Sequence, residues 1–184
     1  MDLDPKCPLC QAIAGYVYMS RGWRWKEAGE HLERAVALDG ADAVRRIWYA
    51  EWLSTQNRLE EARTQAEAAV RLAPADGFPL AMLAGVQFLS GDYRESIRSA
   101  GRALTLDERL QPAHYWMYRS YMALGDEAEA AGALARFATA KLAQPDEEFR
   151  KLQVRIHQLL KDGGRGALVR SWLDELSHER ARDT

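Results

Sequence analysis

Two cysteines stand three positions apart near the start of the 184-residue chain, as Cys7-Pro8-Leu9-Cys10, and the chain has no others. Such a pair can form a redox disulfide or supply half of a zinc site. A redox role is typical of a cysteine pair in a βαβ setting, which this chain lacks. Structural zinc needs four ligands, and the sequence has no second pair of Cys or His ligands that would complete such a site. The pair lies at the start of an expected helix, and the helix dipole favours a thiolate there. Oxidation of the two cysteines to a disulfide is therefore left as an open alternative. We expect neither a metal nor another cofactor.

Other reactive residue types are present without the spacing that catalysis needs. The four histidines show no i, i+4 pairing and are expected to be surface or half-buried helix residues (His31, His114, His157, His178). Gly163-Gly164-Arg165-Gly166 matches neither the Walker nor the Rossmann spacing and is interpreted as a helix break. Neither a G-x-S-x-G nor an H-E-x-x-H motif occurs in the sequence. We therefore expect a protein that is not an enzyme.

Composition narrows the choice of partners. Lys and Arg number 25 against 27 Asp and Glu, a net charge of −2, which argues against direct contact with nucleic acid or an anionic membrane. Apolar residues make up 47% of the chain, too many for a disordered protein. The longest apolar run, 80–89, is too short to cross a bilayer, and the acidic start MDLDPK does not resemble a signal peptide.

The elements are fixed by an internal repeat of 34 residues. One column is small throughout (Ala28, Ala62, Ser96, Ala130), and two others run in the same register (Ala35, Ala69, Ala103, Phe137; Leu38, Leu72, Leu106, Ala140). Turn positions also align at Asn57, Gly91 and Gly125. Three columns in one register indicate a true repeat.

Each repeat is predicted to be two helices. In the second repeat we expect helices over 44–56 and 59–72, with Pro74 stopping the second. Small residues are expected where the helices approach closely, and larger ones between repeats (Tyr49, Leu53, Leu59, Leu72). No segment alternates as a strand does, so we expect essentially no sheet.

The pattern Leu53, Asn57, Leu59, Ala62, Ala69, Pro74 resembles the tetratricopeptide repeat (TPR) family, and the repeat at 77–110 matches nearly as well. The resemblance implies an all-α fold, a right-handed superhelical solenoid of helix–turn–helix units with a C-terminal capping helix pair. Two residues depart from the family pattern: Gln87 replaces a usual aromatic or aliphatic residue, and Tyr118 a usual Gly or Ala. The fourth unit is accordingly expected to pack more loosely.

The division of the chain follows from the same register. Residues 1–7 are expected to end a truncated preceding repeat, four TPR-like units cover 8–42, 43–76, 77–110 and 111–144, and 145–184 form a degenerate fifth helical pair that caps the stack. The first unit carries one extra residue, in its 22–25 turn.

A narrower resemblance rests on Trp23, Trp25, the run 47–50 and the glycines before Trp172. These positions are similar to bacterial repeat arrays that follow a winged-helix DNA-binding domain or a class III adenylate cyclase domain. The resemblance implies a regulatory module of a bacterial transcription regulator, located in the cytoplasm, with the periplasm left open.

In this family the first helix of each unit lines a concave groove, and its positions carry over by register. The expected binding residues are mostly aromatic or apolar (Tyr16, Ile47, Trp48, Glu51, Phe78, Met82, Phe88, Tyr115, Trp116, Arg119, Met122). The groove lacks the Lys/Asn set with which repeat co-chaperones hold a terminal carboxylate. It suits an apolar peptide, an amphipathic helix or a small apolar ligand.

Two alternatives stay open at this stage. The same residues can be packing, covered by a flanking domain or by the cap, since aromatic residues at helical spacing are often core. The repeats can also serve as an assembly scaffold, with two copies pairing as a homodimer through the N-terminal face.

Overall fold

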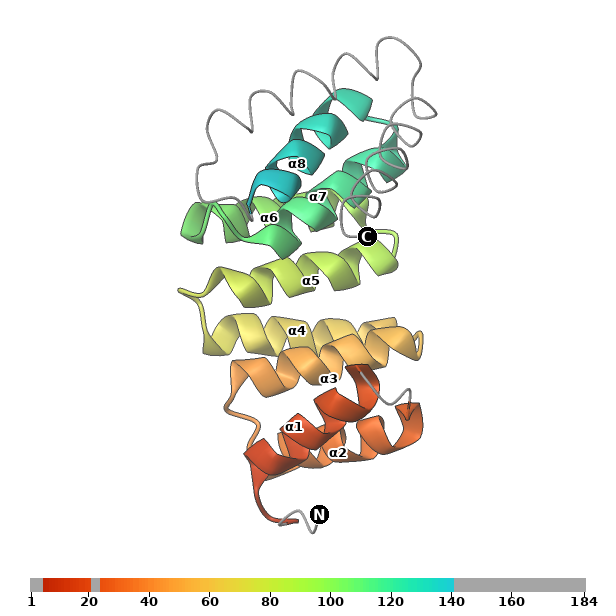
Figure 1. The fold of residues 1–184 in the computed structure, drawn as a ribbon, viewed down its shortest axis with the longest axis vertical. Coiled ribbons are helices and arrows are strands. Elements are labelled where there is room, and N and C mark those ends of the chain that lie inside the picture. Colours follow the sequence, from red (N-terminus) through yellow and green to blue (C-terminus); the bar gives the residue numbers. More distant parts are fainter. Residues whose placement is uncertain (1–4, 21–23, 141–184) are drawn as a thin grey trace, which may run out of the picture.

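The computed structural model describes residues 5–20 and 24–140, and these residues form eight helices and no strand (Figure 1). The helices are α1 Pro8–Ser20, α2 Trp25–Leu38, α3 Ala43–Thr55, α4 Leu59–Leu72, α5 Gly77–Leu89, α6 Tyr93–Leu106, α7 Gln111–Leu124 and α8 Glu127–Thr139. The expected all-α repeat solenoid is therefore confirmed. The predicted cap over 145–184 lies outside the described residues, as do residues 1–4 of the truncated repeat predicted over 1–7.

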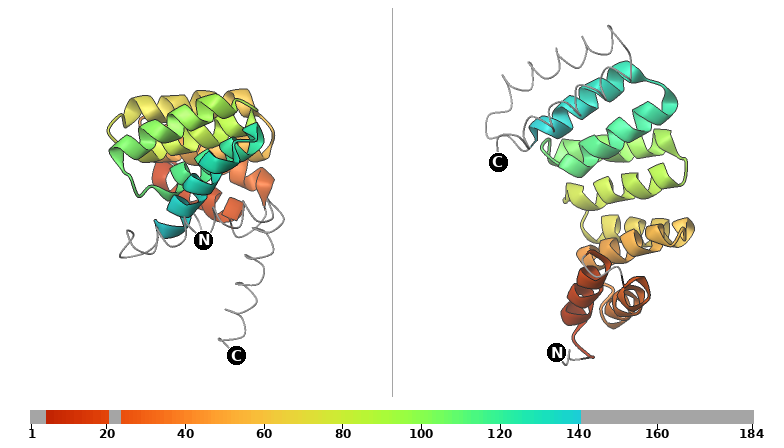
Figure 2. Two further views of the ribbon diagram at one scale, coloured as in Figure 1. Left: turned by 90° about the horizontal axis from the view of Figure 1, so that it is seen from above. Right: turned by 45° about the vertical axis from the view of Figure 1, so that its right-hand side comes forward.

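The helices pack as four consecutive pairs, α1 with α2 through α7 with α8, and the pairs stack along one axis (Figures 1 and 2). In the last three pairs the second helix begins 16 residues after the first, and in the first pair it begins 17 residues after. The additional residue falls between α1 and α2, where the extra residue of the 22–25 turn was expected. Helix α4 has the predicted bounds, and α3 begins and ends one residue earlier than predicted.

The residues at the recurring turn position share one backbone conformation. Asn57, Gly91 and Gly125 all adopt positive φ, at 59°, 84° and 81°. This left-handed conformation ends the first helix of a pair and reverses the chain, and it disfavours residues other than Gly and Asn. The turn residues recur because the same backbone reversal recurs.

Close approach within each pair depends on the small column. Ala28, Ala62 and Ser96 are fully buried and Ala130 is 1% exposed, so no larger side chain fits between the paired helices. Leu53 and Tyr49 are buried in the same core cluster, as expected. Leu72 is not: it is 43% exposed, which corrects the prediction that it fills the space between units. It is the last residue of α4.

Tyr118 replaces the small residue expected in α7, and the opposite helix accommodates it. Tyr118 packs on Ala131, Leu134 and Ala135 of α8, two of which have no side chain beyond Cβ. Small residues on α8 thus provide the space that a small residue on α7 would otherwise leave.

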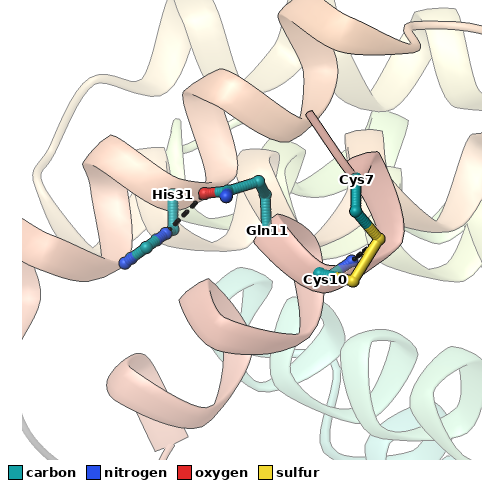
Figure 3. Close-up of a disulfide and its surroundings, with 4 residues drawn as sticks. All are labelled: Cys7, Cys10, Gln11 and His31. Carbon is teal, nitrogen blue, oxygen red and sulfur yellow. Dashed lines mark hydrogen bonds between the residues drawn. A yellow bond between two sulfur atoms is a disulfide. The ribbon is translucent and has the colours of Figure 1, made fainter. Parts of the chain in front are cut away.

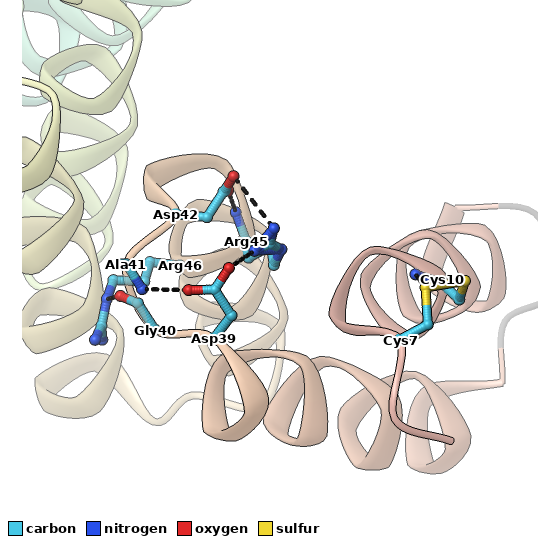
Figure 4. Close-up of polar contacts among 8 residues, drawn as sticks. All are labelled: Cys7, Cys10, Asp39, Gly40, Ala41, Asp42, Arg45 and Arg46. Carbon is cyan, nitrogen blue, oxygen red and sulfur yellow. Dashed lines mark hydrogen bonds and ion pairs between the residues drawn. A yellow bond between two sulfur atoms is a disulfide. The ribbon is translucent and has the colours of Figure 1, made fainter. Parts of the chain in front are cut away.

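The connection between the first two pairs is held by arginines at the start of α3 (Figure 4). Arg45 contacts Asp39 at 2.8 Å and Asp42 at 3.6 Å, while the Asp42 side chain accepts a hydrogen bond from the Arg45 amide as the helix cap. Arg46 donates to the Gly40 carbonyl and to Gln65 of α4, both at 2.6 Å. Arg46 therefore links the turn to the second helix of its own pair.

One buried polar contact joins neighbouring pairs. The hydroxyls of Ser96 in α6 and Ser120 in α7 lie 2.9 Å apart, and both residues are fully buried.

We predict that Ser96→Ala or Ser120→Ala alone lowers the free energy of unfolding by about 1–3 kcal/mol, because each leaves a buried hydroxyl unpaired. The double variant should lose less than the sum of the two, measured by urea unfolding. Ser54→Ala is the control, since its hydroxyl bonds only the preceding turn of its own helix. Additive losses would contradict the pairing.

His114 is 5% exposed, and its Nε2–H donates to the Glu108 carbonyl at 2.8 Å. Burial lowers the pKa of His114, aided by Arg136 and opposed by that hydrogen bond and by Asp107. The unfolded chain therefore binds a proton more readily, so stability should fall as pH drops below about 6.5, the ordinary value.

The effect of His114 is measured against a variant. His114→Gln should flatten the pH dependence of the free energy of unfolding between about pH 6.5 and 5, above the range in which exposed carboxylates titrate. An unchanged slope would show that His114 is not the group responsible.

Candidate binding face

The first helices lie on the inner side of the stack. Helix α1 contacts α3, α3 contacts α5 and α5 contacts α7, whereas among the described elements α2, α4 and α6 do not contact one another. Helices that touch in succession lie on the inside of a curved stack, and those that separate lie outside. We call the solvent-facing side of α1, α3, α5 and α7 the first-helix face.

An aromatic pair marks the N-terminal part of this face. The rings of Tyr16 in α1 and Trp48 in α3 stack with centroids 4.9 Å apart. Tyr16 is 40% exposed, while Trp48 is half-buried and packs against the core. The pair bridges two repeats and presents an aromatic surface to solvent.

A larger aromatic group marks the C-terminal part. Phe88 of α5 lies 5.6 Å from Trp116 of α7, and Trp116 contacts Tyr115 edge-on at 4.9 Å. Phe137 of α8 and Tyr93 of α6 border the group, at 5.6 Å from Tyr115 and 5.5 Å from Phe88. These two residues were not among the predicted site residues. The Phe137 position offered a signal, since it breaks a column of alanines.

Arg119 lies over this aromatic group. Its guanidinium is 4.8 Å from the Phe88 ring centroid and donates a hydrogen bond to the Tyr115 hydroxyl at 2.7 Å. No carboxylate among the described residues pairs with it, and the side chain is exposed. The arginine is thus held by aromatic contacts, with its charge available to an anion.

Glu51 carries the opposite charge, one turn after Trp48 in α3. It is accessible to solvent, yet the surrounding protein removes part of its hydration, which raises the pKa of its carboxyl above the usual value. No Lys, Arg or His of the described residues pairs with it. The first-helix face therefore holds one acidic and one basic side chain that lack a charged partner in the described part of the chain.

The remaining predicted residues lie deeper. Phe78 and Met82 are half-buried against the core of the second pair, and Met122 is half-buried in α7. Ile47 is 1% exposed and belongs to the core, so its assignment to the groove surface is corrected. Ile47 and Trp48 are adjacent on α3, and Ile47 is the one that lies inside the core cluster formed with α2, α4 and α5.

Known structures provide the comparison. Crystal structures of MamA and of YrrB superpose with TM-scores of 0.61 and 0.60, at 17% and 15% identity. The alignments cover 84% of this chain and 83% of MamA, and 91% of this chain and 93% of YrrB. The first TPR of RPAP3, bound to the HSP90 peptide SRMEEVD, matches 67% of this chain over 97% of its own, with a TM-score of 0.58 and 18% identity. This chain has the tetratricopeptide repeat fold.

The likeness concerns the fold, because fewer than a fifth of the aligned residues are identical. No protein-family model matches the chain, and no curated protein matches it by sequence. What the TPR units bind must therefore be argued from their own residues.

Within residues 5–20 and 24–140 no group of three or more His, Cys, Asp or Glu side chains is placed to hold a metal ion. None of the helices in the same ranges is long and apolar enough to span a membrane. A shallow depression of about 300 Å³ lies at the α5–α6 turn beside Leu124, and it is lined in part by Tyr93, which borders the C-terminal aromatic group.

The packing of Trp116 on Gly85 provides a test of how the face is built. A Cβ added at Gly85 would lie 2.7 Å from Trp116 Cε2, whereas one added at Gly101 in α6 would meet nothing within 4 Å. We predict that Gly85→Ala lowers the free energy of unfolding by about 1–3 kcal/mol, through displacement of the indole ring.

Gly101→Ala is the matched control for Gly85→Ala. It should raise the free energy of unfolding by about 0.5–1 kcal/mol, the usual helix-propensity gain. Thermal unfolding checks both variants. Equal effects of the two substitutions would show that Trp116 does not pack on Gly85.

Proposed function

We propose that this chain is a non-catalytic TPR module that binds a peptide or helix of a partner protein along its first-helix face. The observation that carries the proposal is the combination of two aromatic groups with an unpaired Glu51 and Arg119. Aromatic and arginine side chains on one face are typical of protein-binding hot spots. The half-buried anchors are Trp48, Phe78, Met82, Phe88, Tyr115, Trp116 and Met122.

The charges indicate the chemistry of the partner. A segment that places a basic side chain at Glu51 and an acidic one at Arg119, with apolar side chains between, complements the face. Structures of the same fold support a peptide ligand, since the first TPR of RPAP3 holds an HSP90 peptide and YrrB is described as having an unusual peptide-binding site. In a variant of this proposal, the face binds a small apolar ligand, which does not need the charges of Glu51 and Arg119.

The wider setting belongs to the same proposal. The Trp25 turn and the run 47–50 support a regulatory module of a bacterial transcription regulator in the cytoplasm, without direct contact of this chain to nucleic acid or membrane. An accessory module of an adenylate cyclase is the alternative, and the coding sequence on both sides of this segment distinguishes the two.

The charges provide the test of the binding face. A peptide selected from a random displayed library against the whole chain should lose about tenfold or more in affinity to Arg119→Glu, because the charge at that end is reversed. Glu51→Gln should weaken binding less, and Trp48→Ala should remove an apolar anchor. Isothermal titration calorimetry measures all three.

Matched controls use charges on the second helices. Glu67→Gln in α4 and Arg102→Glu in α6 change exposed residues away from the first-helix face and should leave the affinity unchanged. Peptides that bind all the variants equally would show that the first-helix face is not the binding site.

Self-association is a second candidate function, favoured by one surface. Helix α1 exposes an apolar stripe of Leu9, Ile13 and Val17, which are 55%, 48% and 43% exposed. Contiguous apolar surface of this kind is common at subunit interfaces. A dimer in sedimentation analysis that Ile13→Ser converts to a monomer would favour the scaffold, whereas a monomer at all concentrations would exclude it.

A further inference from the structure

The Cys7–Cys10 pair is the reactive group that the proposed function does not use. The two sulfurs are joined as a disulfide, and both residues are half-exposed at the start of α1 (Figure 3). The described residues contain no free cysteine. A disulfide in this position is within reach of thiol compounds in solution.

The disulfide does little for the stability of the stack. It joins residues three positions apart with Cα atoms 5.2 Å apart, within one helical turn. In the chain-entropy description, stabilisation by a disulfide rises with the length of the closed loop, and this loop is very short. The bond connects α1 neither to α2 nor to α3, so packing gives no reason for it.

The surroundings distinguish the two sulfurs. Helix α1 begins at Pro8, directly after Cys7, and the Cys10 amide lies 3.1 Å from the Cys7 sulfur as a hydrogen-bond donor. A thiolate at Cys7 would keep this donor and the positive end of the helix. Cys10 is the third residue of the helix and lies inside its first turn.

Neighbouring polar groups are engaged elsewhere. His31 of α2 contacts the Gln11 side chain at 2.6 Å, and the Arg45 guanidinium pairs with Asp39 and Asp42 (Figures 3 and 4). Neither close-up marks a contact from these groups to a sulfur atom. The Cys10 amide and the helix start are two local features that favour a Cys7 thiolate.

We propose that Cys7–Cys10 is a thiol–disulfide exchange site in which Cys7 is the leaving thiolate on reduction and, in the reverse direction, the thiolate that displaces the external thiol from Cys10. A thiolate of an external thiol attacks the Cys10 sulfur, the S–S bond breaks, and Cys7 leaves as the thiolate. A second external thiolate then attacks the mixed disulfide, which releases Cys10 and the oxidised external disulfide. Two electrons pass from the two thiols to the cysteine pair, and Cys10 takes up a proton.

In the sequence, the lack of a βαβ unit around the cysteines argues against a redox role. The physical requirements are a helix start and solvent access, and α1 meets both. The site is independent of the binding face proposed above, because neither cysteine is among the residues argued to bind the partner there.

The experiment measures each thiol separately in the whole chain. In Cys10→Ser, alkylation of Cys7 by iodoacetamide should reach half its maximal rate at about pH 7.5 or below, as for cysteines at helix starts. In the matched variant Cys7→Ser, alkylation of Cys10 should have its midpoint near the ordinary value of about 8.5. Circular dichroism confirms that both variants fold.

The unmodified chain is then equilibrated with mixtures of reduced and oxidised glutathione. Mass spectrometry should show reversible conversion between the dithiol and an internal disulfide that is two hydrogens lighter. Equal alkylation midpoints near 8.5 in both variants would overturn the assignment of Cys7. Only stable glutathione adducts, with no internal disulfide, would overturn the exchange site.

Discussion

Close contact between the two helices of each pair is the constraint on which the whole stack depends. At Ala28, Ala62, Ser96 and Ala130 the side chain is small and almost completely buried, so the backbones of the paired helices approach as far as sterics allow. That approach sets the shape of one unit. Because a single pair cannot bury its outer apolar side, the units are stable only when stacked, and each unit sets the orientation of the next.

Stacking also determines which aromatic residues reach the first-helix face. Between the first helices α5 and α7, the Trp116 ring packs where Gly85 offers no side chain. Between the first and second pairs, Gly29 of α2 receives the Trp52 ring of α3 in the same way. The residues of the first-helix face are therefore those that the packing between neighbouring units leaves exposed or half-exposed. Its charged residues are those that have no charged partner among the described helices.

The repeat explains how much could be predicted from the sequence. Columns that recur at a fixed spacing predict helix bounds to within a residue, as in α3 and α4, because each copy confirms the others. How deeply an individual side chain is buried in the stack does not recur from repeat to repeat in this way. Ile47 and Trp48 are neighbours in the sequence, yet the packing of the surrounding helices buries the first and leaves the second half-exposed. The burial of His114 and the exposure of Leu72 depend on neighbouring elements in the same way.

The disulfide and the first-helix face share α1 without depending on each other. Tyr16, the α1 residue that stacks on Trp48, lies more than one helical turn beyond Cys10. The S–S bond closes within the first turn, so breaking it releases no contact between α1 and α3. A change in redox state at Cys7 and Cys10 therefore leaves the aromatic pair in place. Exchange chemistry at the end of the stack and recognition along its inner side are compatible in one chain, because rigid units keep the two sites apart.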